Sequence, residues 1–234
     1  MKICGFMKTT LLDYPGHVAC TIFTGGCNFR CPYCHNSELL SMDLPSEYSE
    51  EEIFAFLRKR KALLEGVVIS GGEPTLQPDL PDFAVRIKEA FGLDIKLDTN
   101  GTNPEMLELM LERGLLDFVS MDIKSGPSGY KKASGTASEA MLDRIRQSMA
   151  LLIGGNINYE FRTTVADGLH ERKDFEEIGP FIKGCRNYYL QCYKESDMVL
   201  DLSAGFRPPK KEELLSYAEL VRPYVGRVEL RGID

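Results

Sequence analysis

The sequence predicts an α/β protein in which six strand–helix units form a parallel sheet, curled into a partial (β/α)6 barrel of the TIM type. Segments rich in β-branched residues alternate strictly with segments whose apolar residues recur at helical spacing. At 234 residues the chain can bury one full core, and α/β barrels of this size are commonly one domain. We therefore expect a single domain over residues 1–234, with right-handed crossovers between its strands.

The predicted strands are short, and each ends at a turn signal. The first covers residues 17–24 and stops at Gly25-Gly26, so that residues 25–36 form a loop at its carboxyl end. Further strands are expected at residues 67–69, 95–98, 118–123, 157–165, 187–193 and 227–230. Residues 1–16 are expected to be only a short N-terminal extension. Residues 208–234 should add a last helix and strand.

The predicted helices begin at recognisable caps. Ser49 and Glu52 form a capping box ahead of a helix that stops at Gly66. Asn103-Pro104 opens a helix that ends before Gly114, and Ser138 caps the next one. The remaining helices are expected near residues 80–91, near residues 171–183 and after Pro208-Pro209.

The composition excludes several classes of protein. No apolar run approaches the roughly 18 residues of a membrane span, and the first residues lack the apolar core of a signal peptide. A formal net charge of -7 argues against a large nucleic-acid-binding surface, which is usually basic. Seven cysteines, an odd number without secretion, indicate a reducing compartment. We expect a cytoplasmic protein that binds neither nucleic acid nor membranes.

Three cysteines within eight residues are the main chemical signal of the chain. Cys27, Cys31 and Cys34 lie in the loop after the first strand, where they can meet at one soft-metal site, either zinc or an iron–sulfur cluster. Three ligands leave one coordination position open, as in a catalytic site. Four other cysteines are scattered and are expected to be buried thiols: Cys4, Cys20, Cys185 and Cys192.

The cysteine loop by itself allows other interpretations. The spacing of Cys31 and Cys34 also fits a dithiol redox motif, and Cys31 to His35 fits c-type haem attachment, which the missing signal peptide excludes. His35 could complete a zinc knuckle with three cysteines. The thiols could also be buried small apolar groups.

A second motif follows the second predicted parallel strand. In Ser70-Gly71-Gly72-Glu73-Pro74-Thr75, the glycines allow a ligand close to the backbone, and the Glu73 carboxylate can accept a hydrogen bond from an ammonium group. Most Gly-Gly-Glu strings are only turns. One strand after the cysteine loop, however, this string becomes a strong signal, because chemistry in such barrels lies at the carboxyl ends of the strands.

Side-chain alternation predicts which polar residues face the interior of the barrel. Ser120, Asp122 and Lys124 share one face of their strand, while the opposite face is apolar. Glu160 and Arg162 share a polar face on the following strand with Thr164. Because an interior charge needs a partner, Glu160 and Arg162 are expected either to pair with each other or to clamp a ligand.

Together these motifs resemble the radical S-adenosylmethionine (SAM) superfamily over nearly the whole chain. Within it, the sequence is similar to the glycyl radical enzyme activating proteins, most of all to the activase of anaerobic ribonucleoside-triphosphate reductase. The segments that carry this resemblance are Asp13-Tyr14-Pro15-Gly16, Cys34-His35-Asn36, Ser70-Gly71-Gly72-Glu73, Leu97-Asp98-Thr99-Asn100-Gly101 and Met121-Asp122-Ile123-Lys124.

The resemblance implies one [4Fe-4S] cluster on Cys27, Cys31 and Cys34. Its fourth iron would be chelated by the amino and carboxylate groups of SAM. An electron from the reduced cluster would then cleave SAM into methionine and a 5'-deoxyadenosyl radical. Tyr33 would lie along the adenine.

The resemblance also implies roles for residues after the later strands. Gly71, Gly72 and Glu73 would receive the methionine ammonium group, while Lys124 would bind the carboxylate, with Arg162 as a further SAM-binding candidate. A monovalent cation would be held by three residues: Asp98, Thr99 and Asp122. The chain departs from the pyruvate formate-lyase activase pattern after the sixth parallel strand, where Lys194 follows Tyr193 in place of a histidine.

The implied function is the installation of a glycyl radical on a partner enzyme, with anaerobic ribonucleoside-triphosphate reductase as the expected partner. A flavodoxin- or ferredoxin-type protein would donate the electron. The rival function is a small-molecule radical SAM enzyme such as 7-carboxy-7-deazaguanine synthase, against which the segments 13–16 and 34–36 argue. A zinc-dependent binding module is the third alternative, which requires that no cluster form.

Overall fold

In a computed structural model that describes residues 1–233, the chain forms one eight-stranded sheet whose strands follow one another in sequence order, β1 to β8. The strands are β1 (Ile3–Thr10), β2 (Ala19–Thr24), β3 (Gly66–Gly71), β4 (Asp94–Thr99), β5 (Phe118–Asp122), β6 (Asn158–Val165), β7 (Asn187–Cys192) and β8 (Arg227–Arg231). The helices are α1 (Glu50–Arg60), α2 (Leu80–Phe91), α3 (Pro104–Glu112), α4 (Tyr130–Ser134), α5 (Glu139–Gly154), α6 (Arg172–Phe181) and α7 (Lys211–Val221).

The sheet is parallel from β2 to β8, and only β1 pairs antiparallel, with β2. The fold class and the six strand–helix units are therefore confirmed, since each strand from β2 to β7 is followed by a helix. Residues 1–16 are not a mere extension, however. Their segment Ile3–Thr10 is an edge strand that β2 orders through register pairs such as Phe6 with Ile22.

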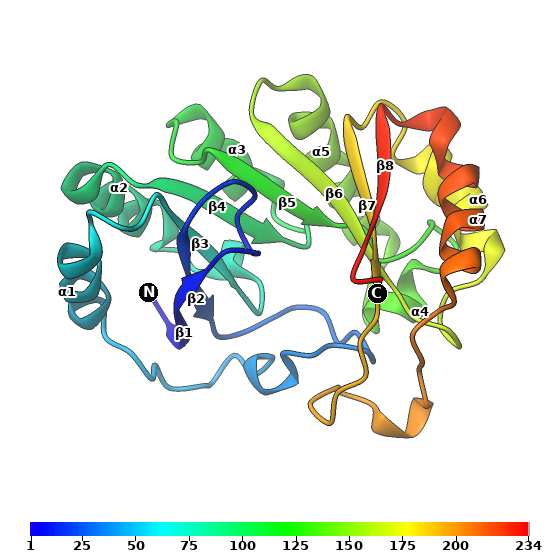
Figure 1. The fold of residues 1–234 in the computed structure, drawn as a ribbon, viewed down its shortest axis with the longest axis horizontal. Coiled ribbons are helices and arrows are strands. Elements are labelled where there is room, and N and C mark those ends of the chain that lie inside the picture. The colour runs from blue at the N-terminus through cyan, green and yellow to red at the C-terminus, as the bar shows by residue number, and fades with distance from the viewer. Residues whose placement is uncertain (234) are drawn as a thin grey trace.

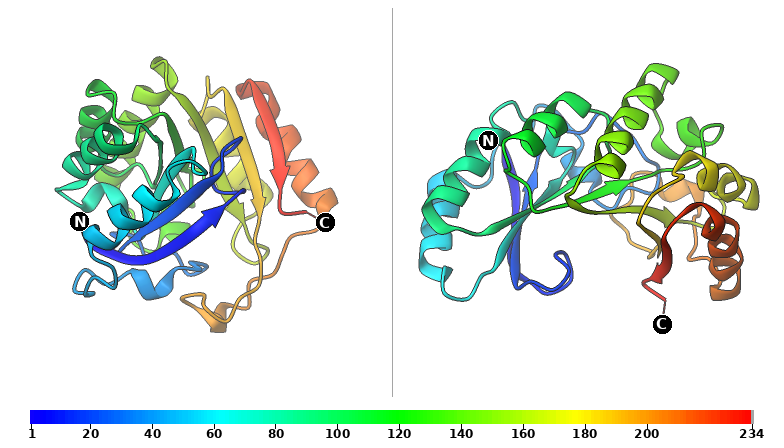
Figure 2. Two further views of the ribbon diagram at one scale, coloured as in Figure 1. Left: turned by 60° about the vertical axis from the view of Figure 1, so that its left-hand side comes forward. Right: turned by 90° about the horizontal axis from the view of Figure 1, so that it is seen from above.

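The sheet curves strongly but does not close into a barrel. Among the described residues, β1 and β8 are the two edges and are not paired with each other. Figure 1 shows the helices around the outside, and the view from above in Figure 2 shows the opening between the β1–β2 hairpin and β8. The apolar core lies between the outer face of the sheet and these helices, where Ile69, Leu97 and Met121 are fully buried.

The predicted caps are formed as expected. Ser49 and Glu52 make the reciprocal bonds of a capping box, and Ser138 accepts a hydrogen bond from the Met141 amide at the start of α5. Asn103 caps α3 in the same way. Helix α4 was not predicted, because its five residues are too few to show a helical period. The carboxyl ends of the parallel strands all point to one end of the molecule, which we call the site face (Figure 1).

Candidate active site

The cysteine loop leaves the carboxyl end of β2 and is held by backbone hydrogen bonds. The Gly26 amide donates to the Leu39 carbonyl (2.8 Å), and the Cys27 amide donates to the Leu40 carbonyl (3.2 Å). Within the loop the Cys34 amide donates to the Cys31 carbonyl (3.0 Å), which makes a tight turn around Tyr33. The loop therefore returns to its own start and presents its three thiols to one cavity.

Burial keeps these thiols protonated in the absence of a metal. It raises the pKa of Cys27 to about 12 and that of Cys31 to about 11, and it also raises the pKa of Cys34. Only the thiolate is a metal ligand, so metal binding at this loop would release protons.

Helix α4 braces the cysteine loop from outside the barrel. The Arg30 amide donates to the Ser134 carbonyl (2.8 Å), and the Thr136 hydroxyl donates to the Asn28 carbonyl (2.9 Å). Gly135 ends the helix at φ 76°, and a Cβ there would stand 2.2 Å from the Arg30 carbonyl oxygen. Glycine is required at this position both for its backbone conformation and for the close approach of the two segments.

Gly71, the last residue of β3, and Gly72 allow the backbone of a neighbouring segment to approach closely, as well as giving a ligand access. A Cβ on Gly71 would lie 2.3 Å from the Thr24 amide nitrogen, and one on Gly72 would lie 2.2 Å from the Gly26 carbonyl oxygen. The Gly72 amide also donates to Thr24 and the Glu73 amide to Gly26. The Gly-Gly-Glu segment therefore lies directly against the start of the cysteine loop.

The Glu73 carboxylate is engaged by protein groups. Its Oε1 accepts bonds from the Thr75 amide (3.1 Å), the Thr75 hydroxyl (2.6 Å) and the Thr99 hydroxyl (2.7 Å), while Oε2 accepts one from the Asn100 amide (2.6 Å). Burial raises the pKa of Glu73, although these hydrogen bonds oppose the shift. The acceptors of this segment that remain for a ligand ammonium are thus Glu73 Oε2, which accepts only one bond, and backbone carbonyl groups.

Charged side chains from β4, β5 and β6 form a network beside the cysteines. Asp122 pairs with Arg162 (2.5 Å) and with Lys124 (2.8 Å), while Asp98 pairs with Lys96 and lies 3.4 Å from Arg162. Burial alone would raise the pKa of both carboxyls, but Arg162 and the adjacent lysines outweigh it and lower both pKa values. Two carboxylates face three basic groups, which leaves one positive charge to receive an anionic ligand group.

The predicted alternation on β5 is confirmed. Of the two alternatives for Glu160 and Arg162, a pair with each other or a ligand clamp, the pair is not formed. Asp122 and Arg162 are direct cross-strand neighbours, and so are Ser120 and Glu160. Glu160 instead accepts a bond from Ser120 (2.8 Å) and pairs with Arg231 of β8 (2.7 Å). Arg162 is engaged by Asp122 of β5 and Glu160 by Arg231 of β8, so both side chains pair with other strands and not with each other.

Tyr33 carries the one buried side-chain polar atom without a hydrogen-bond partner among the described residues, its hydroxyl oxygen. The side chain is 4% exposed and lines the cavity. Its ring contacts His170 edge to face, with the centroids 6.0 Å apart. His170 in turn accepts from the Ala166 amide at Nδ1 and donates from Nε2 to the Lys124 carbonyl (2.8 Å). A buried hydroxyl of this kind in a cavity wall is available to bond a group that enters the cavity, either a water molecule or a ligand.

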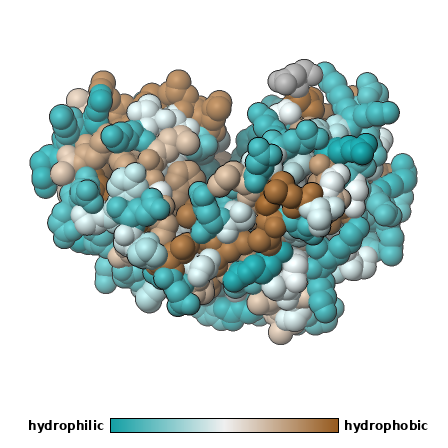
Figure 3. All heavy atoms as spheres, turned by 90° about the horizontal axis from the view of Figure 1, so that it is seen from below, coloured by the Kyte–Doolittle hydropathy of each residue, from teal (hydrophilic) through white to brown (hydrophobic). Residues whose placement is uncertain are grey.

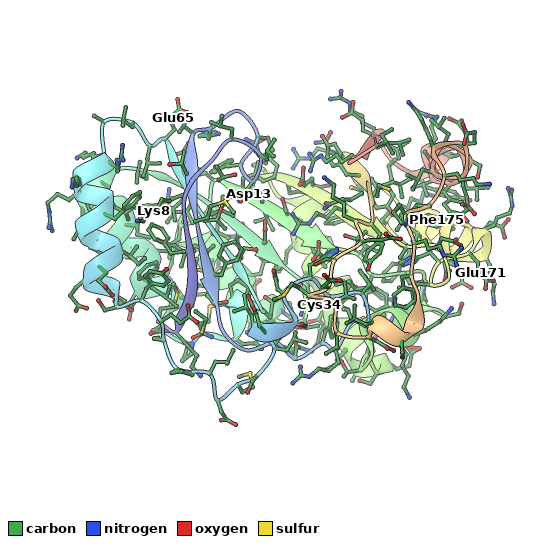
Figure 4. The ribbon with its side chains drawn as sticks, turned by 60° about the horizontal axis from the view of Figure 1, so that its bottom comes forward. Lys8, Asp13, Cys34, Glu65, Glu171 and Phe175 are labelled. Carbon is green, nitrogen blue, oxygen red and sulfur yellow. The ribbon has the colours of Figure 1, made fainter. Side chains whose placement is uncertain are left out.

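A long connection from β7 to α7 lies over the cysteine loop. His35 stacks on Tyr193 (5.2 Å between centroids), and its Nε2 bonds the Lys194 carbonyl (2.6 Å). The Asp201 amide donates to the Pro32 carbonyl (2.9 Å). Figure 4 shows Cys34 near the middle of the site face, beside this connection, which is drawn in orange. Lys194 thus contributes its backbone here, and its side chain is not in the cavity wall.

The structure brings every predicted site residue to one cavity on the site face. Its wall contains the twelve residues that sequence reasoning selected: Cys27, Cys31, Tyr33, Cys34, Gly71, Gly72, Glu73, Asp98, Thr99, Asp122, Lys124 and Arg162. Figure 3 views this face, which is hollowed at its upper edge between two lobes. Cys4, Cys20, Cys185 and Cys192 lie outside the cavity wall and are buried, as predicted.

Sequence reasoning assigned no role to several other residues of the site. Ser70 and Thr164 lie in the cavity wall, and Lys96 forms an ion pair with Asp98, which is part of this wall. Alternation along β4 could have revealed Lys96, because it is two residues before Asp98 on the same face. Asn100 also lies in the wall, within a segment quoted only for its resemblance.

These findings agree with the comparisons with known proteins. The family model of the radical SAM superfamily matches residues 21–178, which run from β2 into α6. The chain belongs to the radical SAM superfamily, and this membership implies a [4Fe-4S] cluster and SAM as cofactors. Among the described residues, no helix is long and apolar enough to cross a membrane.

Within the superfamily, the chain is a radical SAM enzyme that groups with the glycyl-radical enzyme activating enzymes. A protein of Methanocaldococcus jannaschii named as such an enzyme is 31% identical over 234 residues, covering 99% of this chain and 96% of that one. A pyruvate formate-lyase-activating enzyme of Clostridium pasteurianum is 28% identical over 76% of this chain and 74% of its own. Streptococcus suis SuiB bound to S-adenosylmethionine shares the fold, with TM-score 0.66 at 14% identity over 89% of this chain and 49% of that one.

The residues present fit both implied cofactors. Thiolates are the usual ligands of iron–sulfur clusters, and three of them with an open fourth position suit a cluster that also binds a ligand. Among residues 1–233, no three His, Cys, Asp or Glu side chains converge on a single metal ion. In a cluster each of the three thiolates would bind a different iron, so the thiols need not converge on one metal ion. The orphaned Tyr33 hydroxyl and the positive network suit an adenosyl group and a carboxylate.

Proposed function

We propose that this enzyme cleaves SAM reductively and installs a glycyl radical on a partner enzyme. The observation that carries the proposal is the convergence, in one cavity, of three cysteines, the Gly-Gly-Glu segment and the charged network, within a chain similar to glycyl-radical enzyme activating enzymes. When bound, the reduced cluster supplies the electron that breaks the sulfonium bond of SAM and releases a 5'-deoxyadenosyl radical.

The chain's own residues would hold the substrate in place. Cys27, Cys31 and Cys34 hold the cluster and leave one iron open. Lys124 and Arg162, which carry the excess positive charge of the network, receive the carboxylate of SAM. The backbone carbonyls of residues 71–73 accept hydrogen bonds from the ammonium group, and the Tyr33 hydroxyl bonds the adenosyl part.

The radical must be kept from water and from side reactions, so something has to cover the opening between the β1–β2 hairpin and β8. A glycine-bearing loop of the partner can enter this opening and serve as its lid. We propose anaerobic ribonucleoside-triphosphate reductase as that partner, because among the activating proteins the sequence most resembles the activase of this reductase.

The test is anaerobic mixing of the reconstituted, reduced enzyme with SAM and a candidate partner. We expect a glycyl radical signal in electron paramagnetic resonance that disappears when the partner glycine is replaced with alanine. A strong signal on a different glycyl radical enzyme, and none on the reductase, would overturn this choice of partner.

A small-molecule radical SAM reaction, such as that of 7-carboxy-7-deazaguanine synthase, is the second candidate because the open cavity could also admit a metabolite. The two candidates differ in their turnover without a partner. An activating enzyme should consume SAM slowly by itself and faster when the partner covers the opening. Fast partner-free cleavage coupled to the loss of a metabolite would favour the second candidate.

A monovalent cation between Asp98, Thr99 and Asp122 remains a separate proposal, and the geometry gives it little support. Both carboxylates are already paired with Lys96, Lys124 and Arg162, and the Thr99 hydroxyl donates to Glu73. The carboxylate of SAM itself would complete the neutralisation of this network. Activity that responds strongly to exchange of potassium, sodium or lithium would support a cation; an unchanged rate would argue against it.

We also propose that an acidic electron carrier of the flavodoxin or ferredoxin type docks at α4. Lys131 and Lys132 are exposed on this helix, and Arg30 is exposed on the cysteine loop that the helix braces. The Arg30 guanidinium bonds the Cys27 (2.6 Å) and Phe29 (2.7 Å) carbonyls, so its positive charge lies beside the cluster ligands. A basic surface on an acidic protein, adjacent to the cysteine loop, would steer an acidic donor toward this loop.

A further inference from the structure

A chain of buried polar groups joins the Gly-Gly-Glu segment to the cysteine loop. Glu73 accepts the Asn100 amide (2.6 Å), and the Asn100 side-chain amide donates to Asn28 Oδ1 (2.8 Å). Asn28 completes a ring by donating from Nδ2 to the Thr102 hydroxyl (2.7 Å), which itself donates to Asn100 Oδ1 (2.7 Å). We call these four residues the asparagine bridge: Asn28, Glu73, Asn100 and Thr102.

Three of the four bridge residues are buried and Asn28 is half-buried, and their side chains are bonded to one another. Glu73 is 1% exposed, Thr102 is 4% exposed and Asn100 is 5% exposed. None of its side-chain atoms is among the buried, unsatisfied groups of the described residues. A buried polar network of this kind rigidifies the segments that it joins, because breaking one bond leaves the remaining partner desolvated and unpaired.

Two hydrogen bonds from α5 anchor the loop after β4, which carries Asn100 and Thr102. The Arg144 Nε donates to the Thr102 carbonyl (2.7 Å), and the buried Ser148 hydroxyl donates to the Gly101 carbonyl (2.7 Å). The loop after β4 is thus anchored to a helix of sixteen residues. The loop therefore offers a fixed reference to both segments, through its side chains toward Asn28 and through the Asn100 backbone amide toward Glu73.

The segments that the bridge joins have different tasks. Asn28 directly follows Cys27, the first cluster ligand, and Glu73 ends the segment whose backbone lines the SAM side of the cavity. Each segment needs a position relative to the other, because SAM must reach the open iron and the Gly-Gly-Glu backbone at once. The only side-chain bonds from Asn28 to the loop after β4, within the described residues, are those of the bridge.

We propose that Asn100 is a positioning residue that couples the cysteine loop to the SAM-binding segment. It lies in the cavity wall, and we assign it a positioning role because its side chain bonds Asn28 while its backbone amide bonds Glu73. This inference rests on the proposed use of a cluster and SAM at this site, but not on the identity of the partner enzyme.

The test compares Asn28→Ala, Asn100→Ala and the double variant after anaerobic reconstitution of the full chain. The readout is the SAM concentration that produces half of the change in the electron paramagnetic resonance spectrum of the reduced cluster. We expect each single variant to raise this concentration about tenfold, the order of one buried hydrogen bond lost. Because both remove the same bridge, the double variant should also show about tenfold and not about a hundredfold.

Ser49→Ala is the control for a loss of stability alone. Ser49 caps α1, so its loss destabilises the protein, yet it has no bond to Asn28, Glu73, Asn100 or Thr102. The control should lower the melting temperature without moving the half-saturating SAM concentration. Asn28 is only half-buried, so Asn28→Ala should fold even if Asn100→Ala does not.

Two results would overturn the proposed positioning role of Asn100. One is an unchanged half-saturating SAM concentration in Asn28→Ala, and the other is effects of the two single variants that multiply in the double variant. Neither readout requires a glycyl radical enzyme. Failure of the wild-type protein to show any spectral change with SAM would instead overturn the proposed function, so the two failures are distinguishable.

Discussion

At the scale of single residues, the Tyr33 hydroxyl gives the most direct evidence for a ligand. A buried hydroxyl without a partner destabilises a protein by about 1–3 kcal/mol, and this one lines the cavity. Tyr33→Phe should therefore keep or raise the melting temperature of the cluster-loaded protein without SAM. The same variant should bind SAM several-fold more weakly, as titration of the cluster spectrum would measure. Unchanged SAM affinity would mean that the adenosyl group lies elsewhere.

Substitution of a cavity cysteine and of a scattered cysteine should have opposite effects on iron loading. Cys31→Ala should abolish both iron loading and SAM cleavage, because two thiolates cannot hold the cluster with one open iron. Cys20→Ala, on the fully buried face of β2, should lose about 1 kcal/mol of stability by truncation of a small side chain but keep its iron. Iron and sulfide analysis after reconstitution, with SAM cleavage in parallel, separates the two variants. Retained cleavage in Cys31→Ala would exclude the proposed cluster.

At the scale of elements, α4 determines where the cysteine loop lies. Gly135→Ala should push the Arg30 carbonyl away, since the added Cβ would meet it at 2.2 Å. We expect iron loading to fall at least twofold and the melting temperature to fall as well. Gly92→Ala is a matched control at the end of α2, where φ is 66° and no heavy atom lies within 4 Å of the added Cβ.

Both substitutions place a side chain in the left-handed region and should lose about 1 kcal/mol of stability for that reason. Only Gly135→Ala adds a clash with the cysteine loop. Equal iron loading in the two variants would show that α4 does not position the loop.

Also at this scale, the cross-strand pair of Asp122 and Arg162 shows that the charged network depends on how neighbouring strands align. Asp122 and Arg162 face each other because β5 and β6 are parallel and in register. The sequence shows that both face inward, but register is set by the packing of whole strands. The charged network is therefore a property of three neighbouring strands, none of which contains it alone.

At the scale of the whole molecule, the location of the basic residues separates two faces. Lys131 and Lys132 lie on α4 beside the cysteine loop, whereas Lys59 and Lys61 lie at the end of α1, on the opposite side in Figure 1. Lys131→Glu with Lys132→Glu should slow reduction of the cluster by flavodoxin several-fold, more at low than at high salt. Stopped-flow absorbance of the cluster measures this rate.

Two controls belong to this experiment. Lys59→Glu with Lys61→Glu makes the same change of net charge far from the cluster and should leave the rate nearly unchanged. Dithionite, a small reductant that needs no docking surface, should reduce all variants at similar rates. Equal slowing of the two double variants would show that net charge, and not α4, governs the reaction.

The sequence alone determined the alternation of strands and helices, the caps, the cysteine loop and the Gly-Gly-Glu segment, because each depends on local chemistry: apolar periodicity, hydrogen bonding at helix ends, and thiol or glycine spacing within one loop. Tyr33, Asp98 and Thr99 were expected in the site only through the resemblance to a family. The tertiary structure decided the rest. Strand β1 is ordered by pairing with β2, and α4 is too short to show its own period. Glu160 took Arg231 as its partner, Glu73 was found bonded to Thr99 and Asn100, and Asn28 was found bonded to Asn100, because side-chain partners distant in sequence depend on register and packing.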